Sequence, residues 1–231
     1  MKKDFLISFA VLAVFVAFSR TDWDMRIQDC FYDGGWLVSP EIHRKLSIFF
    51  YRGFKVFAAV SGMSCLFCFA GSFFQKRLEP YRGAFLMMTL SLIFVPAVVA
   101  GAKQFTNQYC PKQITRYGGV FEHRRLFDPL PQSGAGRMKK GKCFPAGHAT
   151  SGFAFMALYF CFKSRRKRQA GLAFGLCAGW IAGTYQMLRG EHFLSHTLVG
   201  MTASWIVILT LYALVKRLYT DPASSKRVDN S

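Results

Sequence analysis

Six apolar stretches run through this chain of 231 residues, and they constrain its fold more than any other feature. They are Phe5–Ser19, Val56–Phe74, Ala84–Ala102, Ala149–Phe162, Ala170–Leu188 and Thr197–Val215. A helix needs roughly 20 apolar residues, with a usable range of about 17 to 25, to cross a bilayer. Four stretches have that length, and the first and fourth need their polar flanks to complete a span. Because lipid accepts only helices or closed barrels, we expect an all-α polytopic membrane protein, a six-transmembrane-helix bundle.

Short basic segments predict the orientation of this bundle. They are 75–82, 163–168 and the pair Lys216 and Arg217, which follow the second, fourth and sixth apolar stretches. With six crossings, all three lie on the side of the N-terminus, and Lys and Arg accumulate in short cytoplasmic loops. We therefore expect an integral protein of a bacterial inner membrane. Residues 1–219 would form a single six-span domain, and residues 220–231 a polar cytoplasmic tail.

One long loop, 103–147, conflicts with this charge rule, because it lies on the opposite, periplasmic side and is nevertheless basic. Its cations are Lys103, Lys112, Arg116, Arg124, Arg125, Arg137, Lys139, Lys140 and Lys142, and only Glu122 and Asp128 oppose them. Such a loop is suited to binding an anion. The alternative is a solvated face that touches anionic lipid headgroups. Much of the net charge of +18 lies in the cytoplasmic flanks, and no nucleic-acid-binding motif accompanies it, so we expect no nucleic-acid partner.

The seven cysteines do not have the paired spacing of a zinc site, so we expect no metal from them. Four of them, Cys65, Cys68, Cys161 and Cys177, fall inside apolar stretches and are interpreted as packing residues. Cys110 and Cys143 lie in the same long loop. If that loop faces an oxidising compartment, a disulfide between Cys110 and Cys143 is plausible.

Six crossings would place three polar segments on one face of the membrane. These are Lys103 with Cys110-Pro111, then Pro145–His148 before the fourth stretch, and Arg189–His196 before the sixth. Two imidazoles four residues apart beside an arginine are costly next to a bilayer unless they have a function. Two helices would also begin on this face, so their free N–H groups and positive dipole ends would point at it. Together these groups predict a phosphate-type anion site.

The spacing of these residues resembles the type 2 phosphatidic acid phosphatase (PAP2) superfamily, which is related to vanadium haloperoxidases. Its usual motifs are K-x6-R-P, P-S-G-H and S-R-x5-H-x3-D. Lys103 with Cys110-Pro111 looks like the first, Pro145–His148 like the second, and His192 with His196 like the end of the third. The resemblance covers about Ala84–Gly200 and implies a helix bundle of the PAP2/haloperoxidase type, with 103–147 as the active-site loop.

The resemblance implies a role for each matching residue. His192 would attack phosphorus and form a phosphohistidine, and His148 would protonate the leaving alkoxide. Lys103 and Gly147 would bind phosphate oxygens. This chemistry is reasonable in itself, because a neutral imidazole is a good nucleophile and fixed cations stabilise the charge of the transition state. It requires neither a metal nor another cofactor.

Four positions depart from the family pattern. Cys110 stands in place of an arginine, Ala146 in place of a serine, Gln186 in place of an arginine and His196 in place of an aspartate. Arg189 could take the place of the second arginine. A neutral His196 could accept the Nδ1–H of His192. The candidates for the missing phosphate ligand are Ala146, Lys142, Arg189, Arg124, Arg125 and the basic residues from Arg137 to Lys142.

We therefore expect an integral membrane phosphatase that acts on a lipid phosphate monoester or pyrophosphate at the outer face. Candidate substrates are phosphatidate, phosphatidylglycerophosphate, polyprenyl pyrophosphate and lipid A. The alternatives are a lipid phosphotransferase of the same family and a non-catalytic protein that binds lipid, metal or haem. The metal or haem alternative rests on the i, i+4 pair His192 and His196, with Cys110 and Glu191 as further ligands.

Overall fold

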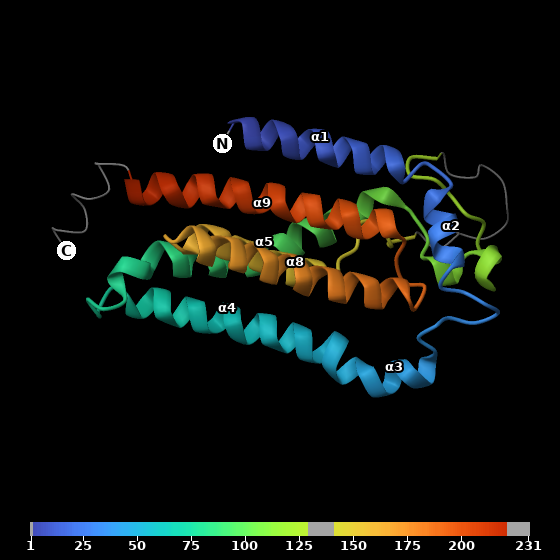
Figure 1. Cartoon of the computed structure of the whole chain (residues 1–231), viewed down its shortest axis with the longest axis horizontal. Helices are drawn as coiled ribbons and strands as arrows, with labels where there is room; N and C mark the ends of the chain where they lie inside the picture. Colours follow the sequence, from blue (N-terminus) through green and yellow to red (C-terminus); the bar gives the residue numbers. More distant parts are fainter. Residues whose placement is uncertain (1, 129–140, 221–231) are drawn as a thin grey trace.

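The computed structural model describes residues 2–128 and 141–220, which form a bundle of helices without a β-strand in these ranges (Figure 1). The five long helices are α1 (Lys2–Phe18), α4 (Phe54–Gly71), α5 (Arg82–Thr106), α8 (Arg165–Met187) and α9 (Leu194–Thr220). The short ones are α2 (Trp23–Asp29), α3 (Pro40–Ser47), η1 (Ile48–Gly53), η2 (Glu79–Tyr81), η3 (Pro111–Gln113), η4 (Thr115–Tyr117), α6 (Thr150–Phe153), η5 (Ala154–Ala157) and α7 (Leu158–Cys161).

Every apolar stretch of the sequence is helical, but the predicted count of six spans is not confirmed. By length and composition, three helices of the described chain could cross a membrane: α4, α5 and α9. A fourth candidate exists if α1 and α2, which are bent by 69° to each other, form one span. The fourth apolar stretch forms only the short helical segment Thr150–Cys161, and α8 is long enough but not apolar enough. The prediction of an all-helical protein with several membrane spans is therefore confirmed, and the number of six spans is not.

The outer helices expose apolar side chains in a way that suits lipid. α4 has no buried residue, although its sequence is almost entirely apolar. Phe67 on α4 and Leu6 on α1 are 69% and 73% exposed. Soluble monomers rarely expose continuous apolar surface of this extent. These helices are therefore those of a membrane protein.

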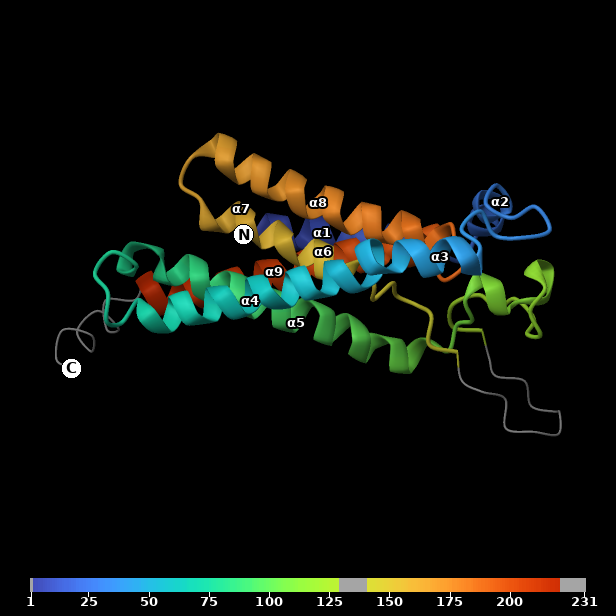
Figure 2. The same ribbon diagram turned by 90° about the horizontal axis from the view of Figure 1, so that it is seen from below.

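Glycines explain why α8 is less apolar than its neighbours. Gly171, Gly175, Gly179 and Gly183 recur every four residues and so lie along one side of the helix. A Cβ at Gly175 would clash with the backbone of Met156, and one at Gly179 would clash with the ring of Phe153. The missing side chains let α8 pack directly on the α6–η5–α7 segment, which lies beneath it in Figure 2.

The bundle has two different ends (Figure 1). The start of α1 and the end of α9 lie at one end, on the left of Figure 1. At the other end, α2, α3 and the described parts of the 107–149 connection gather around the last turn of α5 and the first turn of α9. Between them, α5 packs against α4 and α9, and the buried Ser91 hydroxyl donates to the Ala154 carbonyl at 2.8 Å. This core holds the polar end of α5 beside the start of α9.

Candidate active site

The three polar segments of the sequence meet at the right-hand end of the bundle. Lys103 is in the last turn of α5, His148 lies two residues before the short helix α6, and His192 lies in the connection between α8 and α9. His148 Nδ1 is 3.2 Å from His192 Nε2. Lys103 reaches across to Gly147, where a built Cβ would be 3.1 Å from its Nζ. The ammonium group of Lys103, the glycine backbone at Gly147 and the imidazoles of His148 and His192 thus lie close together.

His192 is held at both of its ring nitrogens. Its side chain is 2% exposed, and its Nδ1 lies 3.4 Å from Cys143 Sγ while Nε2 faces His148. Cys143 forms a disulfide with Cys110, so its sulfur has no hydrogen to donate. This contact favours the tautomer with the hydrogen on Nδ1. The lone pair is then on Nε2, the nitrogen that contacts His148.

His196 does not orient His192 in the way that the sequence suggested. It is 1% exposed, and its ring lies edge-on to Phe144 and Phe193 at centroid distances of 5.0 and 5.3 Å. Its Nδ1 has no hydrogen-bond partner within the described residues. The ring centroid is 5.7 Å from that of His192, but Nδ1 of His192 faces Cys143 instead. The disulfide, rather than a side chain four residues on, occupies the orienting position.

Asp24 is a site residue that the sequence analysis missed. This carboxylate on α2 is 4% exposed and accepts hydrogen bonds from the backbone N–H of Ser195, at 2.9 Å, and from the Ser195 hydroxyl. A negative charge at the N-terminus of α9 is stabilised by free N–H groups and the helix dipole. Ser195 lies between His192 and His196. Asp24 therefore fixes the start of the helix that follows the histidine segment.

Several predicted phosphate ligands have other partners. Arg189 forms an ion pair with Glu191 at 3.2 Å, and the same carboxylate contacts Lys112 at 2.7 Å. The N–H of Ala146 donates to the His196 carbonyl at 2.9 Å, so it is not free for a phosphate oxygen. Lys142 is exposed. The further candidates Arg137, Lys139 and Lys140 lie outside the described residues. Of the predicted phosphate ligands, Lys103 and Gly147 face the histidine pair.

Burial and nearby cations keep both catalytic candidates uncharged. Burial, together with the positive charges of Lys103 and Lys55, lowers the pKa of His148 to about 4. Burial likewise lowers the pKa of His192 well below its usual value, with contributions from His196 and Lys103. Lys55, in the first turn of α4, was not singled out from the sequence. A phosphate dianion bound here would raise the pKa of His148, because an opposite charge favours the imidazolium.

The metal alternative requires a different ligand set from the one expected. Ligand atoms of Cys143, His192 and His196 lie within 4.8 Å of one another. Cys143 is part of a disulfide, however, and zinc prefers a thiolate sulfur. The expected ligand Glu191 is paired with Arg189 and Lys112, and Cys110 is bonded to Cys143. With the disulfide intact, these donors do not fit a metal ion.

The fold is that of a helical membrane protein, and one end of the bundle brings Lys103, His148 and His192 together. The family model of the PAP2 superfamily matches residues 83–219, and the chain belongs to this superfamily. Its members are generally phosphatases, which supports a phosphoric ester hydrolase at the level of the family. The matched segment includes Lys103, His148 and His192, whereas Asp24 and Lys55 lie before it. No curated protein and no solved structure matches the chain.

Proposed function

We propose that the protein is an integral membrane phosphatase that hydrolyses a lipid phosphate monoester or pyrophosphate through a phosphohistidine on His192. The 3.2 Å contact between His148 Nδ1 and His192 Nε2, next to the Lys103 ammonium, carries this proposal. A nucleophile and a proton donor in contact, with a cation beside them, are the groups that phosphoryl transfer needs.

The first step forms the bond between His192 Nε2 and phosphorus. Lys103 and the backbone at Gly147 hold the phosphate oxygens, and the bond from phosphorus to the ester oxygen breaks. The departing alkoxide takes a proton from protonated His148. Because 3.2 Å leaves no room for a phosphoryl group between the two rings, the substrate must separate them when it binds. Substrate entry therefore moves His148 to the side of the leaving group.

The second step returns the enzyme to its starting state. Neutral His148 accepts a proton from water, the oxygen attacks phosphorus, and the bond to Nε2 breaks to release inorganic phosphate. The contact of Cys143 Sγ with Nδ1 holds the His192 ring in one orientation through both steps. A fixed ring avoids the cost of reorienting the nucleophile in each turnover.

A basic cavity beside the histidine site favours a head group with more than one phosphate. This cavity of about 580 Å³ is lined by Arg20, Asp22, Met25, Arg26, Arg116, His123, Arg125 and Asp128. It adjoins the histidine site through Phe193, whose ring lies 5.7 Å from that of His123 and 5.3 Å from that of His196. His123 Nδ1 is buried and has no hydrogen-bond partner in the described chain. Arg20, Arg116 and Arg125 pair with Asp128, Asp29 and Asp22, so a second phosphate would exchange with these carboxylates. The lining still has more arginines than aspartates, and we therefore place lipid A and polyprenyl pyrophosphate ahead of phosphatidate.

The expected orientation places this site on the periplasmic face of a bacterial inner membrane. The basic segments 75–82 and 163–168 and the end of α9 lie at the opposite end of the bundle from the connection between α8 and α9, which contains His192 (Figure 1). That distribution agrees with the accumulation of Lys and Arg on the cytoplasmic side. A disulfide within the histidine site also suits an oxidising compartment.

The test is phosphate release from a panel of purified lipid phosphates, including lipid A, polyprenyl pyrophosphate and phosphatidate. We expect His192→Ala to lower turnover by at least about 10⁴-fold, because it removes the nucleophile. His43→Gln is the matched control, because His43 lies at the same end but bonds Tyr185 through its Nδ1 at 2.7 Å. Labelled phosphate should be trapped on the wild type and not on His192→Ala. Wild-type turnover by His192→Ala would overturn the proposal.

A further inference from the structure

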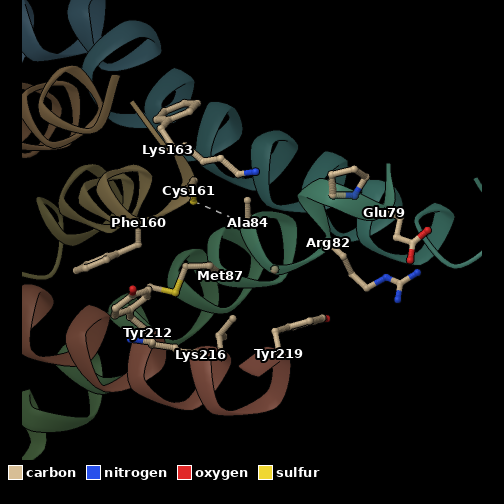
Figure 3. Close-up of a pocket in the computed structure, with 14 residues that line it drawn as sticks. Glu79, Arg82, Ala84, Met87, Phe160, Cys161, Lys163, Tyr212, Lys216 and Tyr219 are labelled. Atoms are coloured by element: carbon tan, nitrogen blue, oxygen red, sulfur yellow. Dashed lines mark hydrogen bonds between the residues drawn. The ribbon is translucent and has the colours of Figure 1, made fainter. Parts of the chain in front are cut away.

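A second pocket opens at the end of the bundle away from the histidines (Figure 3). Its volume is about 410 Å³, and it lies where the start of α5, the end of α7 and the end of α9 come together. It is lined by Glu79, Pro80, Arg82, Gly83, Ala84, Met87, Phe160, Cys161, Phe162, Lys163, Tyr212, Val215, Lys216 and Tyr219. Three basic side chains and one acidic side chain line it, and most of the others are apolar.

The apolar wall of this pocket is rigid. Phe160 on α7 stacks on Tyr212 of α9 with ring centroids 4.1 Å apart. Met87 and Val215 behind them are 2% and 6% exposed and belong to the hydrophobic core. Figure 3 shows Phe160, Met87 and Tyr212 together on one side of the pocket. This wall offers a fixed surface for a hydrocarbon chain.

The basic rim lies next to this wall. Arg82 is held in place because its Nη2 donates to the Ser72 carbonyl at 2.6 Å and its Nε donates to the Ser72 hydroxyl at 3.1 Å. Its guanidinium also lies 4.2 Å above the ring of Phe73. Lys163 follows α7 and Lys216 is on the last turns of α9, so the three positive charges come from three different segments. Glu79 is the acid among the lining residues, and it leaves an excess of positive charge.

A pocket with an apolar wall and a basic rim favours a ligand that has both an anionic group and a hydrocarbon chain. A free phosphate would use the cations but not the wall of Phe160 and Met87. An apolar chain alone would use the wall but not the cations. Basic pockets between helices at a membrane surface bind anionic lipid head groups. The lysine stems of Lys163 and Lys216 can also lie along a lipid chain while their ammonium groups reach the phosphate.

We propose that this pocket binds an anionic phospholipid of the surrounding membrane. The lipid phosphate would lie between Arg82, Lys163 and Lys216, and the first methylenes of its chain would lie against Met87 and Phe160. The site is distinct from the proposed catalytic centre, because it lies at the other end of the bundle. Its role is to bind lipid between α5, α7 and α9, and no reaction of the lipid takes place there.

The test uses the purified full chain and compares phosphatidylglycerol with phosphatidylcholine. Phosphatidylglycerol is anionic and is a phosphodiester, so hydrolysis of a monoester cannot obscure its binding. We expect phosphatidylglycerol to raise the melting temperature and to remain bound in native mass spectrometry, and phosphatidylcholine to do neither. Inorganic phosphate at the same concentration should not displace the bound phosphatidylglycerol in native mass spectrometry, even if it binds at the histidines.

The variant Lys163→Gln/Lys216→Gln should weaken phosphatidylglycerol binding by at least about tenfold, since each basic residue near an anionic lipid contributes to its binding. Both lysines are exposed, so the variant should fold. The control Arg166→Gln/Lys167→Gln removes two charges from the neighbouring helix start, outside the pocket lining. Equal weakening by the two variants, or displacement of phosphatidylglycerol by inorganic phosphate, would overturn the proposal. His192→Ala should bind the lipid like wild type, so this result does not depend on the proposed phosphatase activity.

Discussion

The two ends of the bundle are both basic, but they use their charges differently. At the histidine end, Arg189 and Lys112 share the Glu191 carboxylate, and the buried Asp24 holds the first turn of α9. At the opposite end, Lys163 and Lys216 are exposed around a pocket with a single acidic lining residue, Glu79. A reacting site needs groups fixed in one geometry, whereas lipid attraction and membrane orientation need only accessible positive charge. Net charge alone therefore does not distinguish the two ends, whereas the pairing and burial of the charges do.

After the loss of His192 itself, the largest contrast between the two ends should come from His148. We expect His148→Gln to lower kcat by about 10²- to 10⁴-fold, because it removes the proton donor to the leaving group. In the wild type, kcat/KM should rise as the pH falls from 8 to 5. The reason is that the pKa of His148 is about 4, so its protonated fraction grows throughout this interval while His192 stays neutral.

The measurement for His148 is the pH profile of kcat/KM for both proteins on the same lipid phosphate. His148→Gln should lose the part of the acid-side rise that the imidazole contributes. Ionisation of the substrate itself is common to both proteins and cancels in the comparison. Identical profiles would show that His148 does not supply the proton.

The disulfide tests whether fixed geometry matters at the histidine end. Cys110→Ser opens a loop with a sequence separation of 33, and the loop-closure estimate for this change is about 4 kcal/mol of unfolding free energy. It also frees Cys143 to move away from His192 Nδ1, so phosphate release should fall by more than about tenfold. Thermal unfolding and turnover measure the two effects. Cys177→Ser, which changes an exposed free cysteine, should alter neither.

Gly147→Ala separates binding from stability at the same end. A Cβ at this position would lie 3.0 Å from Cε of Lys103 and 3.1 Å from its Nζ. The flexible end of Lys103 can move away, so the melting temperature should change little. Its ammonium would then leave the phosphate position, and KM should rise by about tenfold, the effect of losing about 1.4 kcal/mol of binding. An unchanged KM would show that Lys103 does not bind the substrate phosphate.

The smallest effect on turnover should come from the opposite end. Lys163→Gln/Lys216→Gln should leave kcat and KM for a soluble short-chain lipid phosphate within about twofold of wild type, since isolated surface charges contribute little. The assay is phosphate release in detergent, with no added phospholipid. A large loss of turnover would show that the two ends are coupled and would remove the distinction drawn between them.

The sequence analysis missed two residues near the histidines because their positions depend on contacts between distant segments. Asp24 and Lys55 lie more than 100 residues before His192 and have no spacing relation to the family motifs. Gly171, Gly175, Gly179 and Gly183 did form a visible pattern, the repeat of small residues that favours close helix packing. That pattern could have indicated that α8 packs against protein rather than only against lipid. No sequence pattern indicated that Arg189 forms an ion pair, because this pair depends on the turn that places Glu191 beside it.

The sequence by itself determined that the chain is helical, that it suits a membrane and that it carries Lys103, His148 and His192 in the order of a PAP2 site. These properties follow from local composition and spacing, which a linear chain displays directly. Only the tertiary structure decided that Nδ1 of His192 contacts Cys143 rather than His196. It also decided that the N–H of Ala146 donates a hydrogen bond to a backbone carbonyl. Such choices are made by packing between segments far apart in the chain, where a shift of a few ångströms selects a different partner.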